Sequence, residues 1–462
     1  MAHDTGQSHW EPAVRNNELS AFLEHVRHRD PDQPEFLQAV EEVMSSIWPF
    51  IDANPRYAEN GLLERIVEPE RIIQFRIAWC DDSGCTQVNR GWRVQHSSAI
   101  GPFKGGMRFH PQVTLSVLKF LAFEQTFKNA LTTIPIGGAK GGADFDPKGK
   151  SPAEIMRFCQ TLAIELHRHL GPQTDIPAGD IGVGAREVGY MAGMIKKLRN
   201  DASAFFTGKH PSHGGSLMRP EATGYGLVYF VEEMLEQHNR SLEGQRVLIS
   251  GAGNVALHAA EKVMQLGGRV VTLSDSGGTL VVDDDTGITP TMLLDIHELK
   301  TQRYGRLADF AERHGLSFEA LRRPWHVPGD VALPCATQNE LQEDDAVTLV
   351  DNGVWLVAEG ANMPTDSAAA RRLHAAKVLY APGKATNAGG VATSGLEMAQ
   401  NATLLKWPRA EVDERLRVIM RGIHETCVAY GRDDSGRIDY QRGANVAGFA
   451  LVADAMLAQG VT

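Results

Sequence analysis

Hydrophobic and polar residues follow two different periods in the first part of the chain. Up to about residue 64 the apolar positions recur at helical spacing, as Leu19, Phe22 and Val26 do. From residue 71, in RIIQFRIAW, apolar side chains occupy every second position. Steps of three or four residues place side chains on one face of a helix, whereas alternation is typical of a β-strand. We therefore predict N-terminal helices, then a strand that the turn DDSG connects to a second strand around Trp92, opening a mixed sheet.

The helical period returns between residues 114 and 131. The apolar face of this segment ends in polar residues, because Leu121, Gln125 and Lys128 lie three or four positions apart. This pattern predicts a helix whose last turns leave the core and line a cleft. For Lys128 taken alone, a core helix whose lysine extends into solvent is an equally good interpretation.

The second half of the chain alternates between strand and helix patterns. The apolar run RVLIS at 246–250 precedes GAGNVA, a helical segment at 257–266 and a second run, RVVTLSD. Further apolar runs occur at 331–333, 354–358 and 378–381, with helical segments between them. This order predicts a doubly wound, Rossmann-like α/β domain. The expected fold is therefore α/β, with an N-terminal mixed-sheet domain, a dinucleotide-binding domain and a cleft between them.

The Gly-rich motif GAGNVA lies where such a domain binds the phosphates of its cofactor. Gly251 allows the tight turn, Gly253 lets the backbone approach the pyrophosphate, and Ala256 permits close packing of the helix. The N-terminus of the helix offers N–H groups to the phosphates. The motif alone is a weak indication, but the strand before it and the helix and strand after it make it strong.

The end of the second strand bears on the choice of cofactor. An acidic side chain there usually binds the ribose 2′-hydroxyl and disfavours a 2′-phosphate. Asp275 is near that place, but Ser274 and Ser276 flank it, and their hydroxyls are able to donate to a phosphate. The charges alone leave NAD and NADP undecided.

Length, charge and cysteine content narrow the classes of protein. A chain of 462 residues is too long for one ordinary core and is expected to form two or three domains. A formal net charge of -11 argues against nucleic acid or an acidic membrane as a partner. Five scattered cysteines indicate a reducing compartment and no metal. The polar N-terminus and the lack of any run near ~18 apolar residues indicate a soluble, cytoplasmic protein.

Three lysines and an aspartate stand close together in a Gly-rich part of the chain: Lys104, Lys128, Lys140 and Asp180. Glycines on both sides of Lys104 and Lys140 remove side chains that would shield the ammonium groups from a ligand. Burial makes a lysine costly unless it is paired, and it lowers the pKa of the amine. These residues therefore predict a site that binds a small dianion and moves protons on it. Taken singly, Asp180 is equally well interpreted as a helix N-cap.

Seven segments carry a resemblance to a known family. They are GWRVQHSSAIGPFKGGMRFHP, KFLAFEQTFKNALTTIPIGGAKGG, PAGDIGVGAREVGYM, RPEATGYG, LPCATQNEL, AEGANMPT and NAGGVATSGLEMAQN. From about Asn54 to the C-terminus the chain resembles glutamate dehydrogenases of the small hexameric bacterial and fungal type, within the Glu/Leu/Phe/Val dehydrogenase family. The resemblance implies a substrate-binding and oligomerisation domain at 1–214, joined by a C-terminal helix at about 438–462. It also implies a dinucleotide domain at 215–437 and a homohexamer.

The resemblance implies roles for the substrate-binding residues. Lys104 resembles the lysine that binds the side-chain carboxylate of the substrate, helped by Ser394. Gln125 and Lys128 correspond to the pair on the α-carboxylate, with Gly179 beside it.

The resemblance also covers the catalytic pair and the cofactor contacts. Lys140 resembles the catalytic lysine, and Asp180 the aspartate that exchanges protons with the amino group. The segment TLSDSGGTLVV is similar to that of the NADP-dependent members, so NADP is the expected cofactor. The expected cofactor contacts are Thr223, Gly251, Gly253, Asn254, Val255, Ser274, Asp275, Asn362 and Asn387.

The chemistry of glutamate and 2-oxoglutarate agrees with these roles. Both molecules carry two separated carboxylates, so two separated cations, Lys104 and Lys128, fix the orientation of Cα. Loss of hydride from Cα gives an iminium, which water attacks. A neutral Lys140 takes the proton of that water, and Asp180 carries protons to and from the nitrogen. With ammonium and NADPH the same groups work in reverse.

Two other functions remain as alternatives. The first is a dehydrogenase of apolar amino acids, which Lys104 argues against because an unpaired charge is costly in an apolar pocket. The second is a nucleotide-sensing protein without turnover, which would be expected to lack Lys140 or Asp180. Both residues are present.

Overall fold

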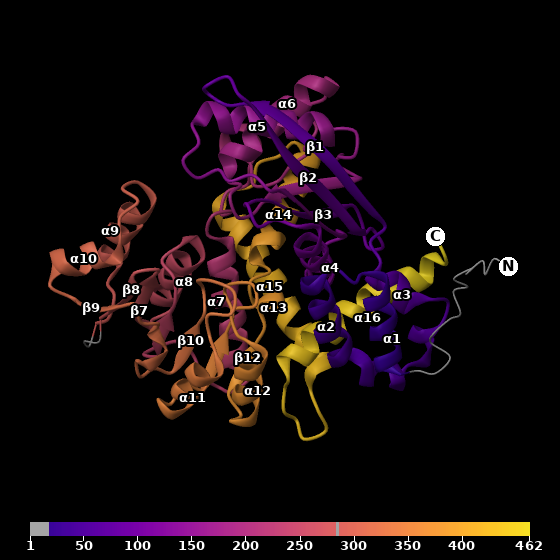
Figure 1. Ribbon diagram of the computed structural model, residues 1–462. Helices are drawn as coiled ribbons and strands as arrows, with labels where there is room; N and C mark the ends of the chain where they lie inside the picture. The colour runs from indigo at the N-terminus through magenta and orange to yellow at the C-terminus, as the bar shows by residue number, and fades with distance from the viewer. Residues whose placement is uncertain (1–17, 283–285) are drawn as a thin grey trace, which may run out of the picture. The chain divides into compact units, whose positions relative to one another are not determined.

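The computed structural model describes residues 18–282 and 286–462 (Figure 1), so the predicted absence of an N-terminal leader falls outside the described residues. The fold is mixed α/β with two mixed sheets, as predicted. The chain divides into two compact units. Unit 1 comprises Met1–Phe127, Pro135–Asp201 and Gly448–Thr462, and unit 2 comprises Lys128–Ile134 and Ala202–Ala447. The domain boundaries given by the family resemblance stay a prediction.

The N-terminal helices of unit 1 pack with the end of the last helix of the chain. One face of α2 is buried from Phe36 to Ile51, at the helical spacing of its apolar residues. The Tyr57 hydroxyl donates to Asp454 (3.0 Å), and the Tyr57 ring packs edge-on against Phe449. The C-terminal segment is thereby fixed to the N-terminal one. These helices are α1 (Leu19–Arg29), α2 (Pro34–Ala53), α3 (Leu62–Val67) and α16 (Tyr440–Gln459).

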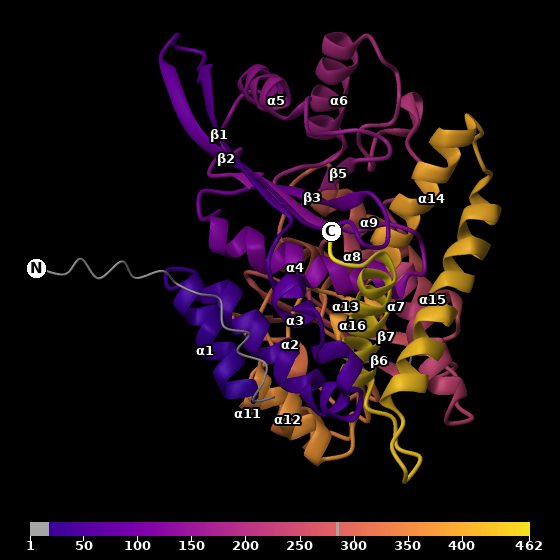
Figure 2. The ribbon, with the colours of Figure 1, turned by 90° about the vertical axis from the view of Figure 1, so that its right-hand side faces the viewer.

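The sheet of unit 1 has five strands in the order β1-β2-β4-β3-β5. The first two form a long antiparallel ribbon (Figure 2), and β2 also pairs antiparallel with β4. β3 lies parallel to both β4 and β5. The bounds are β1 (Arg71–Cys80), β2 (Thr86–Ser97), β3 (Phe103–Phe109), β4 (Gly138–Ala143) and β5 (Asp175–Gly179). The accompanying helices are α4 (Leu115–Leu131), α5 (Pro152–Leu166) and α6 (Ala185–Arg199).

Helix α4 lies directly on β4 because β4 begins with glycine. A Cβ at Gly138 would lie 1.9 Å from the Thr126 hydroxyl and 2.6 Å from Thr126 Cα. Any larger residue would push the helix away from the strand. Gly138 therefore fixes the distance between the helix that bears Gln125 and the strand that bears Lys140.

The sheet of unit 2 has seven strands in the order β12-β11-β10-β6-β7-β8-β9. The five strands that the apolar runs predicted are parallel, and two short antiparallel strands extend the edge next to β7. The parallel strands are β6 (Arg246–Ile249), β7 (Arg269–Asp275), β10 (Val331–Leu333), β11 (Leu356–Ala358) and β12 (Leu379–Ala381). The added strands are β8 (Gly278–Val281) and β9 (Ser317–Ala320).

Both faces of this sheet are buried, as a doubly wound fold requires. Along β6, Val247 and Ile249 belong to one hydrophobic core and Leu248 to another. The same alternation occurs on β7, where Val270 and Val271 face opposite cores. Around the first core lie α7 (Ala222–Glu236), α8 (Asn254–Gln265), α9 (Pro290–Thr301), α10 (Leu307–His314), α13 (Gly383–Thr386), α14 (Gly389–Thr403) and α15 (Arg409–Gly431). The second core contains residues of α11 (Glu343–Asp351) and α12 (Ser367–Ala375).

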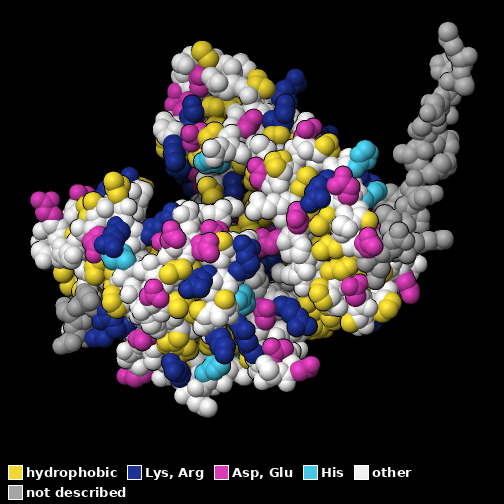
Figure 3. Space-filling view, turned by 60° about the horizontal axis from the view of Figure 1, so that its bottom comes forward, with side chains coloured by type: hydrophobic (Ala, Val, Ile, Leu, Met, Phe, Trp, Pro, Cys, Tyr) yellow, Lys and Arg dark blue, Asp and Glu magenta, His cyan; other side chains and the backbone are white. Residues whose placement is uncertain are grey.

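Two properties of the surface bear on partners. On the face that Figure 3 shows, lysine and arginine side chains are interspersed with aspartate and glutamate. Within the described ranges, none of the helices is both long and apolar enough to cross a membrane.

Candidate functional site

Three neighbouring strands of unit 1 position the two predicted catalytic residues and one predicted substrate-binding residue. Lys104 lies on β3, Lys140 on β4, and Asp180 directly follows β5. Both lysines are buried. Gly106 of β3 allows the close approach of the end of β5, because a Cβ there would be 2.7 Å from the Gly179 carbonyl oxygen and 2.9 Å from Asp180 Cβ.

Lys140 and Asp180 form an ion pair, and a residue that sequence reasoning missed completes it. The Lys140 ammonium lies 3.0 Å from Asp180 Oδ1. The other oxygen, Oδ2, accepts a hydrogen bond of 2.6 Å from Arg108 Nε. Each oxygen of the carboxylate therefore has its own cation. Arg108 stands in the motif FKGGMRF, but its partner is 72 positions away, so no local pattern indicates the contact.

The surroundings of this pair shift the pKa of both members. Burial lowers the pKa of Lys140, and the positive charges of Arg108 and Arg93 add to that effect, although Asp180 opposes it. Burial by itself would raise the pKa of Asp180, but Lys140 and Arg108 outweigh burial and lower that pKa to about 2. Asp180 is therefore an anion at neutral pH.

A second ion pair lies buried in the same sheet and connects three strands. Arg93 on β2 forms a salt bridge with Asp175 on β5, with Nε 2.9 Å from Oδ2. Arg93 Nη1 also donates to the Gly105 carbonyl oxygen on β3 (3.0 Å), next to Lys104. Gln95 adds a hydrogen bond of 2.9 Å to Asp175. This network fixes the strands that carry the predicted catalytic residues.

Helix α4 presents Gln125 and Lys128, both half-buried, one turn apart. In unit 2 the Lys128 ammonium donates to the side-chain oxygen of Asn387. The amide nitrogen of Asn387 donates to Asn362 Oδ1 (3.0 Å) and to the carbonyl oxygen of Ala361 (2.9 Å). The structure thus brings Lys128, predicted to bind the substrate, together with Asn387 and Asn362, predicted to contact the cofactor.

Ser394 is buried on α14, where its hydroxyl donates to the Gly390 carbonyl oxygen (3.0 Å). Thr223 and Arg219 lie next to the same glycine, since a Cβ at Gly390 would be 2.5 Å from the Thr223 hydroxyl and 3.6 Å from Arg219 Nη1. Burial lowers the pKa of Arg219, and its Nε has no hydrogen-bond partner among the described residues. A half-buried guanidinium with an unpaired Nε is suited to bind an anion. Sequence reasoning did not single out Arg219, which appears only as the first residue of the segment RPEATGYG.

A cavity of about 780 Å³ lies in unit 2 around the Gly-rich motif. The predicted contacts that line it are Gly251, Gly253, Asn254, Ser274 and Asp275; Val255, Thr223, Asn362 and Asn387 are not among its lining residues.

The Gly-rich turn that lines this cavity requires glycine at its first position, Gly251. The φ of Gly251 is +87°, in the left-handed region. Its N–H donates to the Ser274 hydroxyl (2.8 Å), which holds the turn against the end of β7. Helix α8 begins at Asn254, so its N-terminal N–H groups lie at the motif.

One end of the cavity is rich in cations that sequence reasoning missed. Lys300 forms a salt bridge with Asp275 (2.9 Å), and Arg306 donates to the Ser276 hydroxyl (2.6 Å). The carboxylate of Asp275 also accepts the backbone N–H groups of Gly277 (2.9 Å) and Leu307 (3.0 Å). Asp275 is therefore held by the protein itself, and the surplus of positive charge fits a phosphate better than a hydroxyl.

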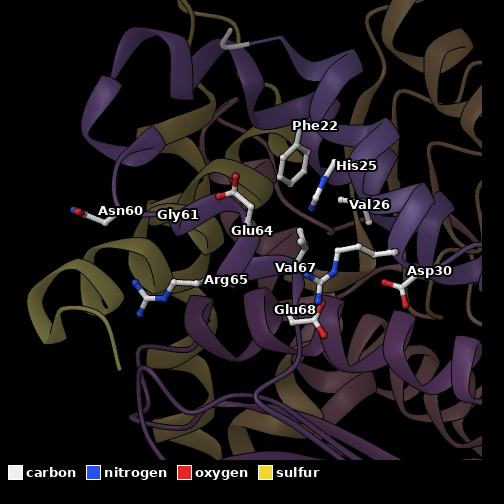
Figure 4. A pocket seen from close by; sticks show the side chains of 11 residues that line it. Phe22, His25, Val26, Asp30, Asn60, Gly61, Glu64, Arg65, Val67 and Glu68 are labelled. Carbon is white, nitrogen blue, oxygen red and sulfur yellow. The ribbon is translucent and has the colours of Figure 1, made fainter. Parts of the chain in front are cut away.

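A second cavity, of about 330 Å³, lies in unit 1 between the first helices. Figure 4 shows Phe22, His25 and Val26 from α1 and Glu64 and Val67 from α3 around it. The predicted site residues do not line this cavity, so it is separate from the residues described above.

The comparisons with known proteins agree with this geometry. The chain matches two family models: Glutamate/Leucine/Phenylalanine/Valine dehydrogenase over residues 214–460, and Glu/Leu/Phe/Val dehydrogenase, dimerisation domain, over residues 69–197. It is similar to the NADP-specific glutamate dehydrogenase of Salmonella typhimurium, with 63% identity over 96% of this chain and 98% of the relative. The enzyme of the same name from Escherichia coli is 62% identical over the same shares. A crystal structure of Plasmodium falciparum glutamate dehydrogenase has a TM-score of 0.94 and 46% identity, covering 100% of this chain and 98% of that one.

Proposed function

Since this chain belongs to the Glu/Leu/Phe/Val dehydrogenase family, we propose that it catalyses the reversible oxidative deamination of L-glutamate to 2-oxoglutarate and ammonia with NADP. Among the alternatives that share this hydride chemistry, one observation selects glutamate: Lys104 is buried one strand away from the Lys140–Asp180 pair. A cation in that position suits a substrate whose side chain ends in a carboxylate, and it would be costly beside an apolar side chain.

The substrate contacts fall into two sets. Lys104 binds the side-chain carboxylate, and Ser394 adds its hydroxyl. The unsatisfied guanidinium of Arg219, near Ser394, supports its inclusion in this set. Lys128 and Gln125, one turn apart on α4, bind the α-carboxylate, and the backbone of Gly179 lies next to it. Charge-assisted hydrogen bonds at both ends fix the orientation of Cα and its hydrogen.

Lys140 and Asp180 carry out the proton transfers. Loss of hydride from Cα leaves a cationic iminium, iminoglutarate, and the anionic carboxylate of Asp180 stabilises this charge. Water adds to the iminium carbon while neutral Lys140 takes one of its protons. Asp180 then relays this proton from protonated Lys140 to the nitrogen, and Lys140, neutral again, takes the proton of the new hydroxyl as the carbonyl forms and ammonia leaves.

The lowered pKa values support this division of roles. Burial favours neutral Lys140, the form that accepts a proton, and the charge of Arg108 keeps Asp180 ionised while Lys140 is neutral. In the aminating direction the same groups act in reverse on ammonium and 2-oxoglutarate.

The residues of unit 2 fit NADP. The turn at Gly251 and the N-terminus of α8 would hold the pyrophosphate, and Thr223, Val255, Asn362 and Asn387 are proposed to contact the rest of the molecule. When bound, NADP supplies the acceptor of the hydride. Lys300, Arg306 and Ser276 would bind the 2′-phosphate, which NAD lacks.

The assembly and location are also proposed. The match to a dimerisation domain supports self-association, and we infer a homohexamer in the cytoplasm from the family resemblance and the reduced cysteines. Light scattering of the purified protein tests this: a mass of six chains is expected, and a monomer at micromolar concentration would contradict it.

An absorbance assay of NADPH oxidation tests the function. Purified protein is mixed with NADPH and ammonium and either 2-oxoglutarate or a branched 2-oxo acid. Rapid oxidation with 2-oxoglutarate is expected. Oxidation with only the branched acid would select the dehydrogenase of apolar amino acids, and no oxidation with either would select the nucleotide-sensing alternative.

A further inference from the structure

The arrangement of β3 places Arg108 on the catalytic face of the sheet in unit 1. Lys104 and Arg108 are four positions apart on this strand, so their side chains leave the same face, with Gly106 between them. Arg108 pairs in register with Gly142 of the parallel strand β4, and Lys140 lies two positions before Gly142. Lys104, Arg108 and Lys140 therefore share one face.

Arg108 contacts the carboxylate that the proposed chemistry uses. Its Nε donates to Asp180 Oδ2 at 2.6 Å, while Oδ1 lies 3.0 Å from the Lys140 ammonium. The side chains of Arg108 and Asp180 are 17% and 16% exposed, so water screens this pair less than it screens a surface salt bridge. With one oxygen held by Arg108, the other faces Lys140.

We propose that Arg108 is a positioning residue of the reaction, which holds the Asp180 carboxylate ionised and turned toward Lys140; this rests on the proposed function. Arg108 acts through Asp180 and the charge of Lys140, and it is assigned no contact with the substrate.

A purely structural role is already filled by a different pair. Arg93 and Asp175 connect β2, β3 and β5 and are fully buried. Arg108, by contrast, donates to a predicted catalytic residue at a partly exposed place. It is therefore placed to set the charge and direction of Asp180 rather than to hold the sheet together.

The charged groups around Lys140 come from three parts of the sheet. They are Asp180 after β5, Arg108 and Lys104 on β3, and Arg93 on β2. Removing the positive charge of Arg108 raises the pKa of the Lys140 amine, because that charge opposes protonation. The neutral form of Lys140 then appears only at higher pH.

The first test is the pH profile of glutamate oxidation in Arg108→Gln. Wild-type protein must first show NADP-dependent turnover of glutamate, since its absence would count against the proposed function and not against this role of Arg108. In Arg108→Gln the acid limb of the kcat profile is expected to move to higher pH by about one unit. At pH values below this limb, kcat should therefore be roughly tenfold lower than in wild type. The KM values for glutamate and NADP should change little.

The second test measures kcat on the alkaline plateau in a double-mutant cycle with Asp180→Asn. Because Arg108 acts there through Asp180, Arg108→Gln should lower the plateau in the wild-type background and have no further effect in Asp180→Asn. Equal fractional losses in both backgrounds, or an acid limb that does not move, would overturn the proposal.

Two further variants control for folding. Arg157→Gln removes a surface pair with Asp82 in the same unit and should leave the profile unchanged. If Arg108→Gln does not fold, Arg108→Lys replaces it in the cycle. A lysine at position 108 keeps the positive charge but lacks the Nε donor. We therefore expect a lower kcat on the alkaline plateau, with little movement of the acid limb. A plateau equal to wild type would contradict the role.

Discussion

At the scale of single residues, the lysines of one Gly-rich block have different environments, which supports the different roles proposed for them. Lys140 is paired with Asp180 and has a lowered pKa, whereas Lys128 donates a hydrogen bond to Asn387 in unit 2. A general base must be able to lose its proton near neutral pH, whereas lysines that bind the substrate carboxylates must keep theirs. For Lys140 the structure meets this requirement by burial and by the positive charges of Arg108 and Arg93, which lower the pKa of its amine.

Lys140→Arg tests the requirement for a neutral amine. Arginine keeps the positive charge and reaches Asp180, but it does not lose its proton in proteins. We expect kcat for glutamate oxidation to fall by about 10²- to 10⁴-fold while NADP binding stays near wild type. Steady-state kinetics and cofactor titration measure the two quantities. A variant with more than a tenth of wild-type kcat would refute the role of Lys140 as the base.

Sequence reasoning predicted the block of lysines together with Asp180 and Asn387, but it missed two arginines near them. Lys104, Lys128 and Lys140 stand out because glycines or a helical face surround them. Arg108 and Arg219 did not stand out, because their significance depends on contacts with Asp180 and with the surroundings of Gly390, and these contacts form only in the folded chain. Local spacing contains no information about such pairs.

At the scale of elements, the strands place charged groups that lie far apart in the sequence. Arg93 of β2 meets Asp175 of β5 across the two strands between them, β4 and β3, and both side chains are fully buried. Removing one member of a buried ion pair leaves the other without a counter-charge. The pair is therefore a strong constraint on the sheet.

Arg93→Met is expected to destabilise unit 1 by about 3–5 kcal/mol, because Asp175 loses its main partner. Arg157→Gln, which removes a surface pair, is expected to cost about 0–1 kcal/mol. Chemical denaturation of both variants, followed by circular dichroism, measures the difference. Equal stability of the two variants would show that the buried pair does not hold the strands.

The elements around β7 set the expected preference for the cofactor. Arg306→Gln removes a cation next to Ser276, so kcat/KM with NADPH should fall by roughly 10- to 100-fold, as expected for one charge-assisted hydrogen bond. The value with NADH should change little. Arg313→Gln, an exposed change on α10, serves as the control. Equal losses with NADPH and NADH would exclude a specific contact with the 2′-phosphate.

Periodicity predicted these elements unevenly. The parallel strands were predicted because they are continuous apolar runs between turns. The antiparallel strands β8 and β9 were missed, since GTLV and SFEA are four residues long and only partly apolar. Their pairing is non-local, so their own sequences carry little of the information.

At the scale of the whole molecule, the chain forms two units that each have a core of their own. The chain passes from unit 1 to unit 2 within α4, and Leu131 belongs to the core of unit 2. The helical period predicted α4 correctly, but it does not indicate which core each turn of a helix joins. Fold class and order of domains were therefore predictable, and the course of the chain between the units was not.

The most direct test of the account concerns Lys104, which distinguishes glutamate from apolar amino acids. The measurement is the ratio of kcat/KM for glutamate to that for norvaline, in wild type and in Lys104→Leu, with the exposed change Lys148→Leu as control. Loss of the buried cation should lower this ratio by about 10²- to 10³-fold, since the substrate carboxylate is left unpaired. A ratio that stays at the wild-type value would contradict the account.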